Sequence, residues 1–164
     1  QFAKEIIMRL FKEIAFAATL TIASLYNIGT GNAHGVTIGN LEIEHPWSRE
    51  TKHGMHMAAG FMSITNNGAE DDRLIKATAE ISDTVQLHNM KMENDVMSMY
   101  EMKDGIVIPA GKTIELRPMS LHVMFMDMKS HPKLGDKFKG TLTFEKAGTV
   151  DVEYEIEASD AGMQ

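Results

Sequence analysis

From Val36 onward, the sequence consists of short runs in which apolar and polar residues alternate, and no long stretch repeats at a helical period. Turn-forming residues separate the runs, as at Asn66–Gly68, Pro109–Lys112 and Lys146–Gly148. Alternation with a period of two is typical of strands with one buried face, and regularly spaced turn residues favour hairpins. The pattern therefore predicts an all-β sandwich or barrel of about eight to ten strands.

A single domain fits the length of 164 residues, which is enough for one hydrophobic core and too short for two. The sequence contains no evident linker, internal repeat or low-complexity segment. We expect the domain at residues 34–158 and a flexible tail at 159–164. The last two strands should form a hairpin that turns at Lys146–Thr149. The formal net charge of −7 and the lack of a Lys/Arg cluster argue against a nucleic-acid partner.

Residues 1–33 have the features of a secretory signal peptide. Basic residues precede a mostly apolar run at 14–28, and small residues at 31–33 provide a cleavage point. A membrane anchor is the alternative, but the run contains several polar residues and is shorter than the roughly 20 apolar residues that span a bilayer. Residues 1–7 precede the expected start at Met8. We therefore expect an exported protein with no membrane span in its mature form.

Methionine and histidine recur at every second position in three of the predicted strands. Residues two apart in a strand point to the same face of the sheet. One shared face is therefore predicted in each of three runs: His122, Met124, Met126 and Met128 in the first, His88, Met90 and Met92 in the second, and Met97 and Met99 in the third. Core residues such as Val123 and Phe125 would face the opposite way.

The pairing of histidine with methionine indicates a site for a soft metal ion. A single methionine is commonly a flexible core filler. The sequence His-x-Met, however, occurs at 88/90 and again at 122/124, and a core has no need of an imidazole beside a thioether twice. Thioether sulfur and neutral imidazole favour copper(I), whereas zinc sites prefer thiolate, imidazole and carboxylate. The chain has no cysteine, which suits an exported copper carrier because thioethers do not form disulfides.

The ordered motifs of the chain resemble those of the periplasmic copper chaperones of the PCuAC type. Ten residues separate the His88 of His88-Asn89-Met90 from Met99, and another twenty-two separate Met99 from His122-Val123-Met124. The segments "HPWSRET", "GFMSITNNG" and "LTFEKAGTV" also resemble that family, and the resemblance covers residues 41–156. It implies a cupredoxin-like Greek-key β-fold, a periplasmic location and delivery of copper(I) to an acceptor protein in cytochrome c oxidase assembly.

The same resemblance implies which residues bind copper. The ligands would be His88, Met99, His122 and Met124, with Met90 as a nearby fifth candidate. Met126 and Met128 are expected to form a methionine-rich rim that guides a partner. A strand advances by about 6.6 Å for every two residues, so they lie too far along it to reach a compact site.

Two segments depart from the family pattern. Many members end in a tail rich in histidine and methionine, whereas this chain ends in "EIEASDAGMQ", so binding of copper by the tail is not expected. The loop at residues 52–57 contains possible ligands of a second copper ion: His53, Met55, His56 and Met57. The alternative for this loop is a solvated turn with incidental histidine and methionine.

The predicted function is copper binding and transfer, without enzymatic turnover. One alternative is a non-catalytic β-sandwich interaction module with a methionine-rich surface, which metal titration would distinguish. A more remote alternative is a copper-dependent oxidase or electron carrier. A blue-copper site needs a cysteine thiolate, which this chain lacks.

Overall fold

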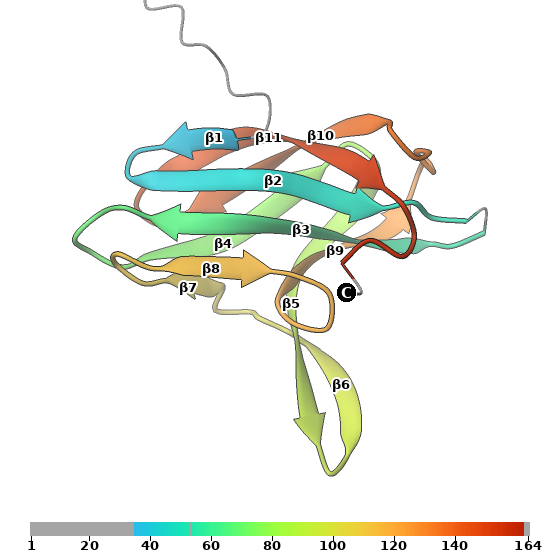
Figure 1. Ribbon diagram of the computed structural model, residues 1–164, viewed down its shortest axis with the longest axis horizontal. Helices are drawn as coiled ribbons and strands as arrows, with labels where there is room; N and C mark the ends of the chain where they lie inside the picture. Colours follow the sequence, from blue (N-terminus) through green and yellow to red (C-terminus); the bar gives the residue numbers. More distant parts are fainter. Residues whose placement is uncertain (1–34, 53, 163–164) are drawn as a thin grey trace, which may run out of the picture. The chain divides into compact units, whose positions relative to one another are not determined.

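The computed structural model describes residues 35–52 and 54–162 (Figure 1). These residues contain eleven strands and no helix: β1 (Gly35–Ile38), β2 (Leu41–Arg49), β3 (Met57–Asn66), β4 (Asp72–Ala79), β5 (Ser82–Glu93), β6 (Val96–Glu101), β7 (Ile106–Ile108), β8 (Thr113–Leu116), β9 (His122–Met128), β10 (Lys137–Phe144) and β11 (Gly148–Glu157). Within this described part, nothing forms a helix with the length and hydropathy needed to cross a membrane. The predicted signal peptide at 1–33 lies outside the described residues.

The strand count exceeds the predicted eight to ten because two of the alternating runs each contain a turn. The first run is divided between β1 and β2 at residues 39–40, and the second is divided between β7 and β8 at residues 109–112. The hairpin expected near Lys146–Thr149 is present, since β10 and β11 pair from Phe144 and Gly148 outward.

Seven of the described strands close into a barrel in the order β2–β11–β10–β4–β5–β9–β3, because β3 pairs in turn with β2. Neighbouring strands of this ring are antiparallel except β2 and β11, which are parallel. The other strands attach to single ring members: β1 to β2, β6 to β5, β7 to β4 and β8 to β3. The predicted all-β architecture is confirmed.

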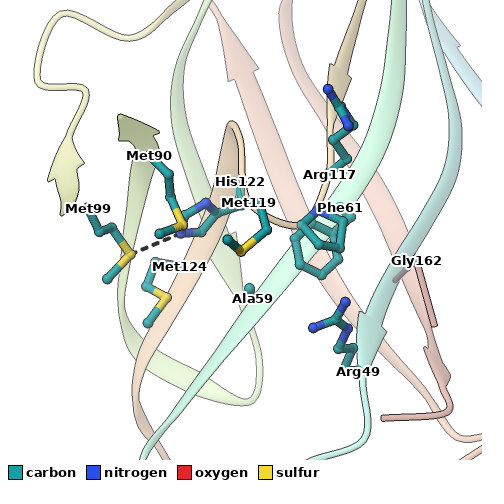
Figure 2. A pocket seen from close by; sticks show the side chains of 11 residues that line it. Arg49, Ala59, Phe61, Met90, Met99, Arg117, Met119, His122, Met124 and Gly162 are labelled. Carbon is teal, nitrogen blue, oxygen red and sulfur yellow. Dashed lines mark hydrogen bonds between the residues drawn. The ribbon is translucent and has the colours of Figure 1, made fainter. Parts of the chain in front are cut away.

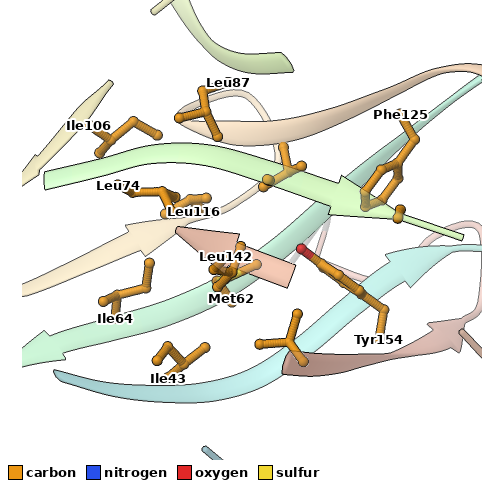
Figure 3. Close-up of a cluster of buried hydrophobic side chains, with 14 of the residues drawn as sticks. Ile43, Met62, Ile64, Leu74, Leu87, Ile106, Leu116, Phe125, Leu142 and Tyr154 are labelled. Atoms are coloured by element: carbon orange, nitrogen blue, oxygen red, sulfur yellow. The ribbon is translucent and has the colours of Figure 1, made fainter. Parts of the chain in front are cut away.

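Three aromatic rings pack at one place in the barrel interior. Phe125 meets Phe138 and Tyr154 edge-on at centroid distances of 5.4 and 5.3 Å, and the latter two stack at 4.9 Å. Figure 3 shows Phe125 and Tyr154 among the buried aliphatic side chains. Gly60 of β3 lies against them, since a Cβ there would be 2.7 Å from Phe125 Cζ and 2.9 Å from Tyr154 Cε1. Only glycine leaves room for both rings.

The alternation in the first part of β9 sets His122 and Met124 outside the barrel. Val123 and Phe125 belong to the core, so His122 and Met124 point outward. The alternation ends at Asp127, whose φ of 51° is in the left-handed region. Met128, which follows, packs against the core cluster. The expectation that Met128 joins an exposed rim is therefore wrong, because the backbone at Asp127 interrupts the period of two.

Strand β5 is longer than its place in the barrel requires. Residues Ser82–His88 pair with β9, whereas His88–Glu93 pair with β6. The β5–β6 hairpin consequently projects away from the barrel (Figure 1). Its turn residues Asn94 and Asp95 have φ values of 51° and 61°, as a two-residue type I′ turn requires. The hairpin is a projecting arm that begins at the level of His88.

The segment after β11 contacts the barrel. Arg49 donates two hydrogen bonds to the carbonyl of Ala161, from Nε at 3.0 Å and from Nη2 at 2.7 Å. A Cβ at Gly162 would be 3.0 Å from the ring of Trp47. The flexibility expected of residues 159–164 stays a prediction, but contacts with the domain extend at least to Gly162.

Candidate metal centre

The two predicted histidine ligands lie on neighbouring strands. His88 of β5 and His122 of β9 are direct partners across the antiparallel ladder, and their ring centroids are 5.7 Å apart. Both side chains are buried, with exposed fractions of 8% and 5%. Met90 and Met99 form a cross-strand pair in the projecting arm, two residues beyond His88. The fold therefore gathers the predicted site residues from three strands.

Four of these five residues line one groove of about 670 Å³: Met90, Met99, His122 and Met124. Figure 2 shows Met90 and Met99 on one side of His122, with Met124 close by. His88 lies beside His122, outside the groove lining. The exposed fraction is 9% for Met124 and 45% for Met99, so one wall of the groove is buried and the other is open to solvent.

The hydrogen bond of His122 determines which ring nitrogen is free. Its Nδ1 lies 2.8 Å from the carbonyl oxygen of Ser120, which can only accept, so Nδ1 carries the proton and donates. The Nε2 lone pair is left unprotonated. It faces the groove, 3.2 Å from the sulfur of Met99 (dashed line in Figure 2).

His88 is held in the opposite tautomer. Its Nε2 donates to the side-chain oxygen of Gln86 at 2.8 Å. Its Nδ1 is buried and has no hydrogen-bond partner among the described residues. A buried nitrogen without a partner is unusual and calls for an explanation, such as a missing ligand. The two histidines thus offer one unprotonated nitrogen each, and with the nearby thioethers they fit a soft cation.

The environment of His88 favours the neutral form of its ring. Burial lowers the pKa of His88 below the ordinary value of 6.5, and the neighbouring ring of His122 lowers it further, whereas the carboxylate of Glu101 opposes the shift. A neutral imidazole is the form that binds a metal ion.

The described part of the chain shows no cluster of the side chains that commonly bind other metal ions. Residues 35–52 and 54–162 contain no group of three or more His, Cys, Asp or Glu side chains that could hold a metal ion. The donor set of the groove is therefore distinguished by its thioethers, which select soft ions.

Sequence reasoning missed three residues of this site. Gln86 and Ser120 each stand two residues before a site histidine and fix its tautomer. The matching segments "QLHNM" and "SLHVM" are the signal that could have identified them. Met119 also lines the groove, 65% exposed and with a φ of 64°. It lies in the loop before β9, where an argument from strand alternation does not apply.

The far end of the groove is basic and aromatic. Arg49, Phe61 and Arg117 line it, and the guanidinium carbon of Arg49 lies 5.8 Å from the ring centroid of Phe61. Figure 2 shows both arginines on the side away from Met99. In a protein with a formal net charge of −7, this is a local concentration of positive charge beside the histidine and methionine cluster.

The loop suggested for a second metal ion does not contribute to this groove. Met55 and Met57 are each 48% exposed, His56 is exposed, and none of them is part of the groove lining. His53 lies outside the described residues. Met57 of β3 pairs across the ladder with Met126 of β9, and Met126 is two residues along β9 from Met124.

Comparison with known proteins identifies a family. The family model described as "LpqE-like: Putative lipoprotein LpqE-like" matches residues 41–156. The protein named "Putative lipoprotein Lxx21020" from Leifsonia xyli subsp. xyli (strain CTCB07) is 29% identical over 147 residues, which cover 88% of this chain and 87% of that protein.

Solved structures give the fold. The "Copper-bound PCuAC domain from PmoF2" is 30% identical with a TM-score of 0.65, over 76% of this chain and 98% of that one. The "Apo PCuAC domain from PmoF1" is 30% identical with a TM-score of 0.66, over 76% and 99%. The protein DR1885 from Deinococcus radiodurans, solved in solution with CuI, shares the fold at 20% identity and a TM-score of 0.58, over 82% and 87%.

These similarities confirm the cupredoxin-like β-fold expected from the sequence. Because the family match spans residues 41–156 and the PCuAC similarity spans 76% of the chain, the chain belongs to the LpqE-like family and has a PCuAC-type domain.

Proposed function

We propose that this protein is a copper(I) chaperone that binds the ion in the groove and transfers it to an acceptor. The observation that carries the proposal is the pair of unprotonated nitrogens on the two partner histidines, His88 Nδ1 and His122 Nε2, of which the second lies 3.2 Å from the sulfur of Met99. The copper-bound PmoF2 domain and the CuI form of DR1885 support this choice of metal. The ligands would be His88, Met99, His122 and Met124, with Met90 adjacent.

The proposed ligands differ in solvent exposure, and this difference suggests which of them hold the ion and which one exchanges it. The buried imidazoles and Met124 would hold the ion away from water, while the exposed thioether of Met99 is open to exchange with an incoming donor. Copper is cargo in this proposal, and the protein performs no turnover of its own. The oxidase alternative predicts oxygen consumption by the copper-loaded protein in the presence of a reductant, and the chaperone proposal predicts none.

The proposed location is the periplasm. The curated relative from Leifsonia is named a lipoprotein, which supports export, and residues 1–33 would be the signal peptide. The proposed acceptor is a protein of the cytochrome c oxidase assembly pathway. That part of the proposal rests on the resemblance to PCuAC chaperones.

One copper(I) ion is expected to bind tightly in the groove at neutral pH, and more weakly as the solution becomes acidic. Protons compete with copper for the imidazole of His88, but burial lowers the pKa of His88, so this competition should set in at a lower pH than for an ordinary histidine. Thioethers do not titrate, so the loss should be partial. Anaerobic competition with a chromogenic copper(I) chelator from pH 7.5 to 5 measures this.

The pH series also separates the alternatives. An interaction module with incidental methionines would show no tight equivalent at any pH. An affinity that is unchanged between pH 7.5 and 5 would mean that the histidines are not ligands, and would contradict the assignment even if copper binds.

A second copper ion at His53, Met55, His56 and Met57 stays a prediction. The exposure of Met55 and Met57 and the position of Met57 beside Met126 support it. The triple variant Met55→Leu, His56→Asn, Met57→Leu should release copper to the chelator about tenfold more slowly, with groove affinity nearly unchanged. Stopped-flow absorbance measures that rate. A wild-type rate would favour the solvated-turn alternative.

A further inference from the structure

The projecting arm carries methionine on one face along its whole length. Met90 pairs with Met99, and Met92 pairs with Met97, in the antiparallel register of β5 and β6. Residues two apart in a strand share a face, and so do direct cross-strand partners. The four side chains therefore lie on one face of the hairpin, which we call the methionine face: Met90, Met92, Met97 and Met99.

The methionine face leads into the groove. Met90 and Met99 line the groove together with His122 and Met124. One pair further toward the barrel, β5 contributes His88, which is the partner of His122. Three successive levels of soft donors are thus spaced along β5, about 6.6 Å apart, from the tip of the arm to the histidine pair.

Solvent exposure is low only at the innermost level, because each of the two outer levels pairs one exposed methionine, Met92 or Met99, with one half-buried one. Met92 at the tip is 63% exposed and Met97 is half-buried. Met99 at the middle level is 45% exposed, and His88 and His122 at the inner level are 8% and 5% exposed. The histidine pair is therefore the level least accessible to an ion arriving from solvent, and the methionines of the arm are the more accessible donors.

The opposite face of the arm contains the polar contacts that stabilise the hairpin. Lys91 Nζ lies 3.1 Å from a carboxylate oxygen of Glu93 and 5.7 Å from the ring centroid of Tyr100. Asn89 Nδ2 donates to the Tyr100 hydroxyl at 3.1 Å. The arm projects from the barrel, so the thioethers at its tip fill no core position, and a packing role does not explain them.

We propose that Met92 and Met97 form a copper(I) entry site at the tip of the arm, separate from the loop at residues 52–57, and that this entry site loads the groove through Met90 and Met99. This inference rests on the proposed function. Two thioethers alone should bind copper(I) more weakly than thioethers with imidazoles, so the ion moves inward. In each step, a copper–sulfur bond to Met90 or Met99 forms as a bond to Met92 or Met97 breaks. Copper remains monovalent, and no proton moves because thioethers carry none.

Methyl NMR of the protein labelled with [13C-methyl]methionine, titrated anaerobically with copper(I) alone, tests this site. Single Met→Leu variants assign the signals. The first equivalent should shift the methyl signals of Met99 and Met124, and the second should shift those of Met92 and Met97. In the double variant Met92→Leu, Met97→Leu, the first equivalent should still bind, but loading of the groove should slow about tenfold.

A matched control uses the other face of the same hairpin. Lys91 and Ser98 are also direct partners, so Lys91→Ala, Ser98→Ala perturbs the arm without removing a thioether. It should load at the wild-type rate. Equal slowing in this control would assign the effect to a loosened hairpin and overturn the proposal.

The outcomes also separate this inference from the proposed function. If the groove signals shift and those of Met92 and Met97 stay fixed in excess copper(I), the tip site is wrong and the chaperone proposal stands. If the signals of Met99 and Met124 do not shift at all, the groove assignment fails, and the loading path fails with it.

Discussion

The double variant His122→Asn, Met124→Leu is expected to bind copper(I) at least about 100-fold more weakly than the wild type. The first change removes Nε2, which faces the groove 3.2 Å from Met99 Sδ, and the second removes the most buried thioether of the groove. Leucine has nearly the volume of methionine, so the outer face of β9 should keep its packing. Competition with a copper(I) chelator measures the affinity, and circular dichroism checks the fold.

A control variant changes the same residue types elsewhere. Met62 is 3% exposed in the core and His45 is exposed on β2, so Met62→Leu with His45→Asn removes a buried thioether and an imidazole outside the groove. Its copper(I) affinity should match the wild type. If the site variant retains wild-type affinity as well, the ligand assignment is wrong.

Gly60→Val is expected to destabilise the folded protein by about 3 kcal/mol or more. The new Cβ would lie 2.7 Å from Phe125 and 2.9 Å from Tyr154, both of them fully buried. Both rings also pack against Phe138, so a shift of either ring would disturb that packing. Gly60 pairs directly with Val123, between the two site residues of β9, so strain there should also weaken copper binding. Thermal unfolding should show a midpoint lower by about 10 °C.

Gly111→Ala provides the comparison. Gly111 has a φ of 66°, but nothing lies within 4 Å of the position where its Cβ would be. Its substitution should cost only the backbone strain, about 1 kcal/mol. Similar losses of stability in the two variants would show that crowding by Phe125 and Tyr154 is not the reason for glycine at position 60.

The parts of the site that lie on regular strands could be predicted from the sequence. Alternation with a period of two places His122 and Met124 on one face, and it does the same for His88 and Met90. The structure then adds the register, in which the two histidines are direct partners. Register between distant strands depends on the whole barrel, so no local pattern encodes it.

The parts that the sequence did not predict depend on local backbone geometry. Asp127 and Met119 adopt left-handed φ angles, which end the alternation in β9 and put a thioether into a loop. The tautomers of the histidines depend on Gln86 and Ser120, whose roles become visible only when hydrogen-bond partners are located in space. Irregular backbone at Asp127 and Met119, and the hydrogen bonds that hold the two histidine rings, are therefore what the sequence did not predict.

The position of β11 in the barrel determines when the barrel can close during synthesis of the chain. β11 is the last strand in sequence, yet it lies in the ring between β2 and β10. Until residues 148–157 are available, both neighbours have an unpaired edge and the ring stays open. A chain that emerges from its amino end, from a ribosome or a translocation channel, therefore cannot complete this domain early. We expect the ring to close only after β11 is available, which would leave the chain unfolded during export if residues 1–33 are a signal peptide, as we propose.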